Sequence, residues 1–168
     1  VPGISILVGM GILRGIRVLD LATYIAGPAA ATIMSDFGAD VIKVERPPHG
    51  DPFRYLSRVP GMPVSDLEYC WMLDSRNKKS IAIDLQKPEG AAVARKLAAS
   101  ADIVAENFKP GTMVKYGLDY AALSKLNERL IYVAHKGFLP GPYEHRTALD
   151  EVVQMMGGLA YMTGRPGD

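Results

Sequence analysis

The chain has 168 residues, 48% of them hydrophobic, and a formal net charge of +1. This length and apolar content are sufficient for one domain, or one part of a larger domain, built around a hydrophobic core. The basic residues are spread along the sequence and form no cluster, which argues against a nucleic-acid-binding or anionic-membrane-binding surface.

The single cysteine and the first residues bear on the location of the protein. Cys70 cannot form an internal disulfide and has no second thiol for a metal site, as is typical of a reducing cytoplasm. The opening 13 residues are too short to span a bilayer and have no basic residue before their apolar run, unlike a signal peptide. We therefore expect a cytoplasmic protein with no membrane partner, in which 1–12 are an extra segment and 1–9 precede the natural start at Met10.

From Ile16 onward, apolar runs alternate with turns and alanine-rich stretches, a pattern typical of parallel βαβ units. The stretch 46–66 is rich in proline and glycine, has no sustained period, and is interpreted as an irregular excursion. This alternation predicts an α/β, Rossmann-like fold with a mainly parallel sheet and flanking helices. The expected strands are 16–21, 41–45, 80–85, 102–107 and 130–135, and the expected helices are 27–40, 88–100 and 148–164.

Ligands of open parallel sheets bind beyond the carboxyl ends of the strands, so the residues after each strand are candidate binding residues. Several of them are basic or carry an amide, which suits a long anionic ligand, although such residues are also common in solvated loops. The residues in question are 23–27, Arg46, 85–87, 107–109 and 135–136.

Several common sites are absent from the sequence. The turn at 22–30 lacks G-x-G-x-x-G, and the chain contains no Walker motif, so NAD and ATP are poor candidates. The three histidines lack metal-ligand spacing, which argues against a metal site. No serine occupies a G-x-S-x-G turn.

The order of several long motifs resembles the class III coenzyme A transferases. The resemblance runs through "LRGIRVLDLATYIAGPAAATIMSDFGADVIKVERPPHGDPFR", "DSRNKKSIAIDLQKPEG", "ADIVAENFKPGTMVKYGLDY" and "GPYEHRTALDEVVQMMGGLAYMTG". This family also contains carnitine CoA-transferases, formyl-CoA transferases and α-methylacyl-CoA racemases. Membership implies acyl-CoA and a carboxylic acid acceptor as substrates, no metal, and an interlocked homodimer.

The resemblance implies that Arg46 binds coenzyme A near its adenosine phosphate end, since a guanidinium can bind two phosphate oxygens at once. The alternative is an ion pair with Glu45 or another carboxylate. For the remaining residues the alternative is an ordinary surface turn. The resemblance implies further coenzyme A contacts from Ile25, Ala26, Ile83, Asp84, Leu85, Gln86, Asn107, Phe108, Lys109, Lys115, Thr147, Ala148, Leu149 and Asp150.

This sequence departs from the family pattern at several positions. Formyl-CoA transferases have a glutamine where this chain has Ile25, which argues against formyl or oxalyl substrates. The neutral Gln86 replaces a usual lysine, and Lys115 replaces an arginine and loses its planar fork. The racemases place a histidine at the position of Leu149, and a leucine cannot transfer a proton.

The transferases of this family act through an aspartate that forms an acyl anhydride and then an aspartyl-CoA thioester. Asp168 matches the loop before that aspartate, so we expect the nucleophile beyond it. Residues 13–168 are then the amino-terminal part of the large domain, without the small domain or the carboxy-terminal return. Two alternatives stay open: an isomerase or racemase of the same family, and a non-catalytic module that binds coenzyme A.

Overall fold

The computed structural model describes residues 11–164, so the expectations for 1–9 and Asp168 lie outside it. The described chain forms two compact units. The first contains residues 11–108 and 112–135, and the second contains 109–111 and 136–164. Each unit is described by itself below.

The first unit is built on a five-stranded parallel sheet with the strand order β3-β2-β1-β4-β5. Consecutive residues of one strand pair with consecutive residues of the next. Val18, for example, lies opposite Val41 of β2 and Ile103 of β4. The predicted α/β fold with a mainly parallel sheet is therefore confirmed. The strands are β1 (Arg17–Asp20), β2 (Asp40–Glu45), β3 (Lys79–Ala82), β4 (Ile103–Glu106) and β5 (Ile131–Ala134).

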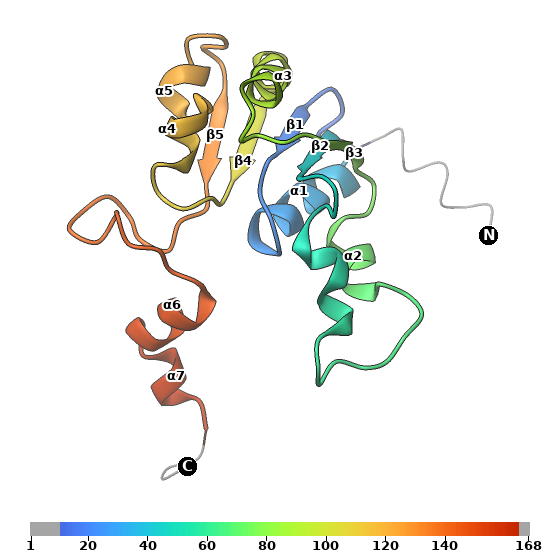
Figure 1. The fold of residues 1–168 in the computed structure, drawn as a ribbon, viewed down its shortest axis with the longest axis vertical. Helices are drawn as coiled ribbons and strands as arrows, with labels where there is room; N and C mark the ends of the chain where they lie inside the picture. Colours follow the sequence, from blue (N-terminus) through green and yellow to red (C-terminus); the bar gives the residue numbers. More distant parts are fainter. Residues whose placement is uncertain (1–10, 165–168) are drawn as a thin grey trace. The chain divides into compact units, whose positions relative to one another are not determined.

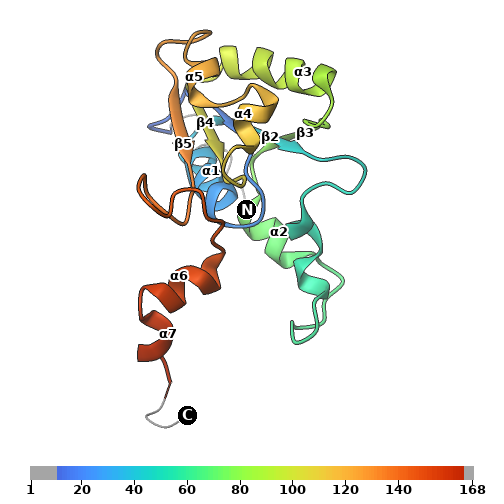
Figure 2. The ribbon, with the colours of Figure 1, turned by 60° about the vertical axis from the view of Figure 1, so that its left-hand side comes forward.

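Helices cover both faces of this sheet (Figures 1 and 2). Val18 and Val41 pack on one face with Ala31 of α1, whereas Leu19 and Val104 pack on the other with α3, α4 and α5. Successive residues of a strand point to opposite faces, which explains why adjacent apolar residues enter different cores. The helices of this unit are α1 (Ala26–Asp36), α2 (Tyr69–Asp74), α3 (Pro88–Ala99), α4 (Thr112–Tyr116) and α5 (Tyr120–Leu123).

The second unit contains the short helices α6 (Asp150–Met156) and α7 (Leu159–Met162). The single helix predicted over 148–164 is therefore wrong. Gly158 has φ of 78°, a left-handed conformation that ends one helix and starts the next. Within residues 11–164, no helix is long and apolar enough to cross a membrane.

The excursion predicted over 46–66 is partly ordered. It contains a 3-10 helix, η2 (Pro52–Arg58). The carboxylate of Asp51 accepts a hydrogen bond from the backbone N–H of Phe53 and so caps this helix, and Pro52 fits its first position. The residues after β2 thus have a defined path close to the sheet.

Candidate functional site

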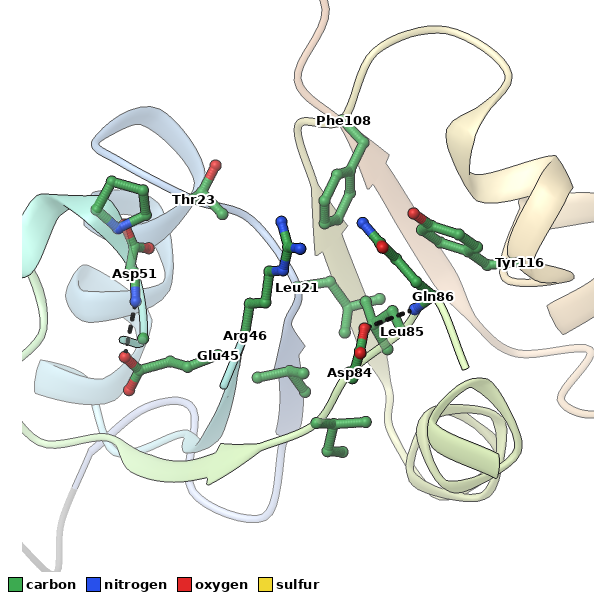
Figure 3. Close-up of a pocket in the computed structure, with 14 residues that line it drawn as sticks. Leu21, Thr23, Glu45, Arg46, Asp51, Asp84, Leu85, Gln86, Phe108 and Tyr116 are labelled. Carbon is green, nitrogen blue, oxygen red and sulfur yellow. Dashed lines mark hydrogen bonds between the residues drawn. The ribbon is translucent and has the colours of Figure 1, made fainter. Parts of the chain in front are cut away.

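A pocket of about 250 Å³ lies beyond the carboxyl ends of four neighbouring strands, β1 to β4, within the first unit (Figure 3). This is the edge at which ligands of parallel sheets bind. Its lining comes from the end of β2, from the segments that follow the four strands and from α4: Leu21, Thr23, Val44, Glu45, Arg46, Gly50, Asp51, Pro52, Ile83, Asp84, Leu85, Gln86, Phe108 and Tyr116.

Arg46 is the one cationic residue among those that line the pocket. Its exposed side chain extends into the open space beside Gln86 and the ring of Phe108 (Figure 3). Among residues 11–164, none forms an ion pair or hydrogen bond with its guanidinium. Within the described residues, the ion pair considered as the alternative for Arg46 is therefore not formed, and the guanidinium is available to an anionic ligand.

Glu45 precedes Arg46 in the sequence, but its carboxylate is hydrogen-bonded to residues other than Arg46. Its buried carboxylate binds the guanidinium of Arg54 through two hydrogen bonds of 2.6 and 2.8 Å and accepts further bonds from Ser80 and the N–H of Asp51. Burial alone would raise the pKa of Glu45, but the hydrogen bonds from Arg54, Ser80 and Asp51 outweigh it and lower the pKa to about 2. Glu45 is therefore ionised and fully engaged at neutral pH.

A buried network of charged side chains, Lys43, Asp51, Lys78 and Asp20, lies next to the pocket and includes its lining residue Asp51. Lys43, 1% exposed, forms an ion pair of 2.9 Å with Asp51 and donates to the carbonyl of Ala22 at 2.8 Å. Lys78 binds the buried carboxylate of Asp20 at 3.0 Å. Burial lowers the pKa of Lys78, and the nearby Asp20 opposes that effect. Because each buried charge has an opposite partner, the network fixes the loops that surround it.

Strand order reverses between β1 and β4, which makes the space above these two strands the switch point of the sheet. The loops that follow them are tied together there. The Asn107 amide accepts from the N–H of Thr23 at 2.9 Å and donates to its carbonyl at 2.7 Å. Both polar ends of this amide therefore bind the protein itself, so Asn107 fixes the loop in this structure.

Six residues expected to contact coenzyme A line the same pocket: Arg46, Ile83, Asp84, Leu85, Gln86 and Phe108. The first five come from the ends of the adjacent strands β2 and β3, and Phe108 follows β4. Figure 3 shows Gln86 directed toward Phe108 and Tyr116. The pocket thus combines one free cation, a neutral amide and two aromatic rings.

Other expected residues lie elsewhere. Ile25, 51% exposed, is the N-cap of α1, and Ala26 begins that helix. Backbone N–H groups in the first turn of a helix have no acceptor within the helix. Lys115 is exposed on α4 and is not part of the pocket lining, which instead includes its neighbour Tyr116.

The remaining expected residues belong to the second unit. Lys109 is exposed, and the stretch 147–150 leads into α6 with Leu149 as its N-cap. The contact predicted between these residues and coenzyme A stays a prediction.

Sequence reasoning missed several lining residues, above all Asp51 and Tyr116. Asp51 follows a glycine directly after the "ERPPH" turn, which marked it as a loop residue but not as a buried one. No sequence pattern indicated that Tyr116 lines the pocket, because the rotation of α4 about its axis decides whether Tyr116 or Lys115 faces it. Over residues 11–164, the structure contains no group of three or more His, Cys, Asp or Glu side chains arranged to hold a metal ion.

Comparison with known proteins gives matches to CoA-transferases, both for the family profile and for individual relatives. The sequence profile of CoA-transferase family III matches residues 13–168. The chain is 45% identical over 156 residues to the succinyl-CoA–L-malate CoA-transferase beta subunit of Chloroflexus aurantiacus, covering 92% of this chain and 38% of that protein. It is 44% identical over 160 residues to the succinate–glutarate CoA-transferase of Agrobacterium fabrum, covering 92% of this chain and 40% of that protein.

A solved structure has the same fold. The crystal structure of a CAIB/BAIF family protein from Brucella suis matches with a TM-score of 0.83 and 40% identity, over 94% of this chain and 42% of that chain. The chain thus spans about two fifths of the length of these relatives. Because the family profile matches nearly all of the sequence, the chain belongs to CoA-transferase family III.

Proposed function

We propose that this chain forms the coenzyme-A-binding part of an enzyme that moves coenzyme A from an acyl-CoA thioester to a free carboxylic acid. The observation that carries this proposal is the pocket at the carboxyl edge of the sheet, with Arg46 as its unpaired cation among residues 11–164. A planar guanidinium binds phosphate oxygens in pairs. Family membership supports the same ligand.

In this proposal the adenosine phosphate end of coenzyme A lies against Arg46. The rings of Phe108 and Tyr116 supply flat apolar surfaces of the kind on which a purine base stacks. Gln86 offers an amide in place of a second cation, so the phosphates rely mainly on Arg46. Ile83, Asp84 and Leu85, which precede Gln86 on the segment after β3, line the pocket on the same side as Gln86.

The thioester end is proposed to lie at the start of α1, where the backbone N–H groups near Ile25 and Ala26 can donate to a carbonyl oxygen. Asn107 supports this region by fixing Thr23. Further contacts from Lys109, Lys115 and the stretch 147–150 are proposed on the family resemblance alone.

The chemistry implied by the resemblance needs a carboxylate nucleophile. An aspartate oxygen attacks the thioester carbonyl carbon and releases the CoA thiolate, which leaves a mixed anhydride. The thiolate then attacks the aspartyl carbonyl of the anhydride and releases the donor acid. The acceptor carboxylate reverses these steps. We assign no residue of 11–164 to the covalent steps, and their role in this proposal is binding.

We propose a dicarboxylic acid as acceptor and succinyl-CoA as the first donor to test. Two relatives at 44% and 45% identity are named for succinate or succinyl-CoA, with glutarate or malate as partner acid. We further propose a homodimer of the full-length protein, as the resemblance implies, and a cytoplasmic location, which the single cysteine supports.

The test is an exchange assay on the full-length natural protein that carries this sequence. The protein is incubated with succinyl-CoA, with and without malate or glutarate, and all CoA esters and free acids are quantified by mass spectrometry. We expect the new CoA ester and free succinate to form in equal amounts, and only when an acceptor is present. Equal release of succinate and free CoA without an acceptor would show thioester hydrolysis and contradict transfer. CoA binding without turnover on a panel of acids would identify a binding module.

A further inference from the structure

One buried carboxylate connects two loops that the proposed function uses separately. Asp51 is 2% exposed. One of its oxygens, Oδ1, accepts the N–H of Tyr24 at 3.1 Å and that of Phe53 at 2.9 Å. The other, Oδ2, forms the 2.9 Å ion pair with Lys43. Asp51 therefore touches both the loop after β1 and the start of η2.

The loop after β2 is closed onto the sheet by the same residue. The backbone N–H of Asp51 donates to the Glu45 carboxylate at 3.0 Å, and the N–H of Gly50 donates to the Arg46 carbonyl at 2.8 Å. These two bonds fold the chain from 46 to 51 into a compact turn. The direction of the Arg46 side chain depends on that turn.

The loop after β1 needs support at Tyr24. This residue has φ of 61°, a conformation that a bulky side chain disfavours. Such a conformation persists only where the surroundings hold it in place. The bond from the Tyr24 N–H to Asp51 supplies part of that support, and Lys43 adds another by binding the carbonyl of Ala22.

We propose that Asp51 is a positioning residue for coenzyme A, which acts by holding the Arg46 turn and the Tyr24 loop in one fixed arrangement. This inference rests on the proposed function, in which Arg46 binds the phosphate end and the start of α1 binds the thioester end. With the two loops joined, both ends of the ligand meet a site that is already arranged before binding.

The direction in which CoA affinity changes when the Asp51 carboxylate is removed distinguishes a positioning role from a direct contact with the ligand. Asp51 lines the pocket, and a carboxylate that touched the phosphates would repel them. Removing its charge would then tighten binding of coenzyme A. Loss of a positioning residue weakens binding instead, because the two loops are no longer held together.

The experiment uses Asp51→Ala in the full-length natural protein, because alanine removes the oxygen that accepts both N–H groups, whereas asparagine would keep it. CoA affinity is measured by calorimetry at a temperature where the variant is folded. We expect the dissociation constant to rise about tenfold, the usual scale for coupled residues in one network. Amide hydrogen exchange should become faster in peptides that span 22–27. Asp40→Ala is the matched control, since it removes a half-exposed carboxylate at the first residue of β2, the end of that strand opposite the pocket. Unchanged or tighter CoA binding by Asp51→Ala would overturn the proposal.

A second variant covers the case in which the unpaired Lys43 destabilises the protein. Lys43→Met with Asp51→Ala removes both buried charges, which is usually better tolerated than removing one. It should show the same tenfold weakening and faster exchange, and wild-type affinity would overturn the proposal. If the wild-type protein itself does not bind coenzyme A, the proposed function fails, whereas the exchange at 22–27 still tests whether Asp51 joins the loops.

Discussion

Glu45 and Arg46 are adjacent in the sequence and oppositely charged, yet their side chains have different partners. Glu45 is buried and bound by Arg54, whose guanidinium also lies 3.9 Å from the ring centre of Trp71. Arg54, together with Ser80 and the N–H of Asp51, satisfies the Glu45 carboxylate, and Arg46 is left to the pocket. The "GDPFR" stretch of the sequence therefore contributes to the site through Arg54, which holds Glu45, and through Asp51, which joins two loops.

The ionised state of Glu45 makes stability depend on pH. The unfolded chain takes up this proton near 4.5, whereas the folded protein takes it up only at about 2. The stabilisation is therefore fully present above about pH 5 and is lost as the pH falls toward 2, up to about 3 kcal/mol. Urea unfolding measured across this range should show a steadily falling free energy of unfolding.

Glu45→Gln provides the comparison for this pH dependence. It keeps the size of the side chain but has no proton to gain, so its free energy of unfolding should change less between pH 5 and 2. Asp36→Asn removes a carboxylate that is bound by Arg76 near the surface and should leave the wild-type slope almost unchanged. Equal slopes for wild type and Glu45→Gln would contradict the assignment.

Gln86 marks a position at which a charge can be added to the pocket. Gln86→Lys would place a second cation beside Arg46, and we expect CoA to bind roughly three- to tenfold more tightly, with a steeper dependence on salt. The measurement is calorimetric titration at two salt concentrations. Ala99→Lys adds the same charge to an exposed position at the end of α3 and should leave the affinity unchanged. Weaker binding by Gln86→Lys would argue against phosphate at this position.

At the level of elements, α3 sets the position of the segment that carries Asp84. A Cβ atom at Gly90, in the first turns of α3, would lie 2.1 Å from the carbonyl oxygen of Asp84. Gly90→Ala should therefore push the helix and this segment apart and destabilise the protein by about 1–3 kcal/mol. It should also weaken CoA binding, because Asp84 and Gln86 line the pocket.

Urea unfolding and CoA titration of Gly90→Ala measure these two effects together. Val93→Ala, at an exposed position of the same helix, should change stability by less than about 0.5 kcal/mol and leave the affinity as it is. Wild-type stability in Gly90→Ala would show that the helix can move without cost, contrary to this account.

The elements could be predicted from sequence where local chemistry decides them. The five strands occur where the apolar runs indicated, each within a few residues. Burial explains the central strands, whereas the edge strands β3 and β5 are mostly exposed and follow the local sequence pattern. The helix over 148–164 was wrong because periodicity cannot show whether Gly158 adopts a helical or left-handed conformation. The order of helix η2 also escaped prediction, since it depends on Asp51 being buried beside Lys43.

Over the whole molecule, the location of the site was more predictable than its lining. The rule for carboxyl ends of strands indicated Arg46 and the residues after β3 and β4. The rule could not show which of these residues line the same pocket. That depends on the strand order β3-β2-β1-β4-β5, which results from pairing between segments far apart in the sequence. Arg46 and Gln86 share one pocket only because β2 and β3 are neighbours.

The described chain exposes large apolar side chains, among them Leu149, Met155, Tyr161 and Met162 at 69–96% exposure. We therefore predict that residues 1–168, expressed alone, associate in solution, since exposed apolar surface of this kind promotes self-association. Sedimentation velocity at several concentrations measures this directly. Met155→Lys with Met162→Lys should reduce the association, and a sharply melting monomer at every concentration would contradict the prediction.

In the proposed function, coenzyme A binds at the carboxyl edge of the sheet through Arg46. The most direct measurement is calorimetric titration of the full-length natural protein with coenzyme A, comparing wild type, Arg46→Ala and Arg58→Ala. Arg58 pairs with Glu68 on the surface and serves as the matched control. We predict that Arg46→Ala weakens binding about ten- to hundredfold, the range expected for a charge-assisted contact, and that Arg58→Ala leaves it unchanged. Wild-type affinity in Arg46→Ala would contradict the claim.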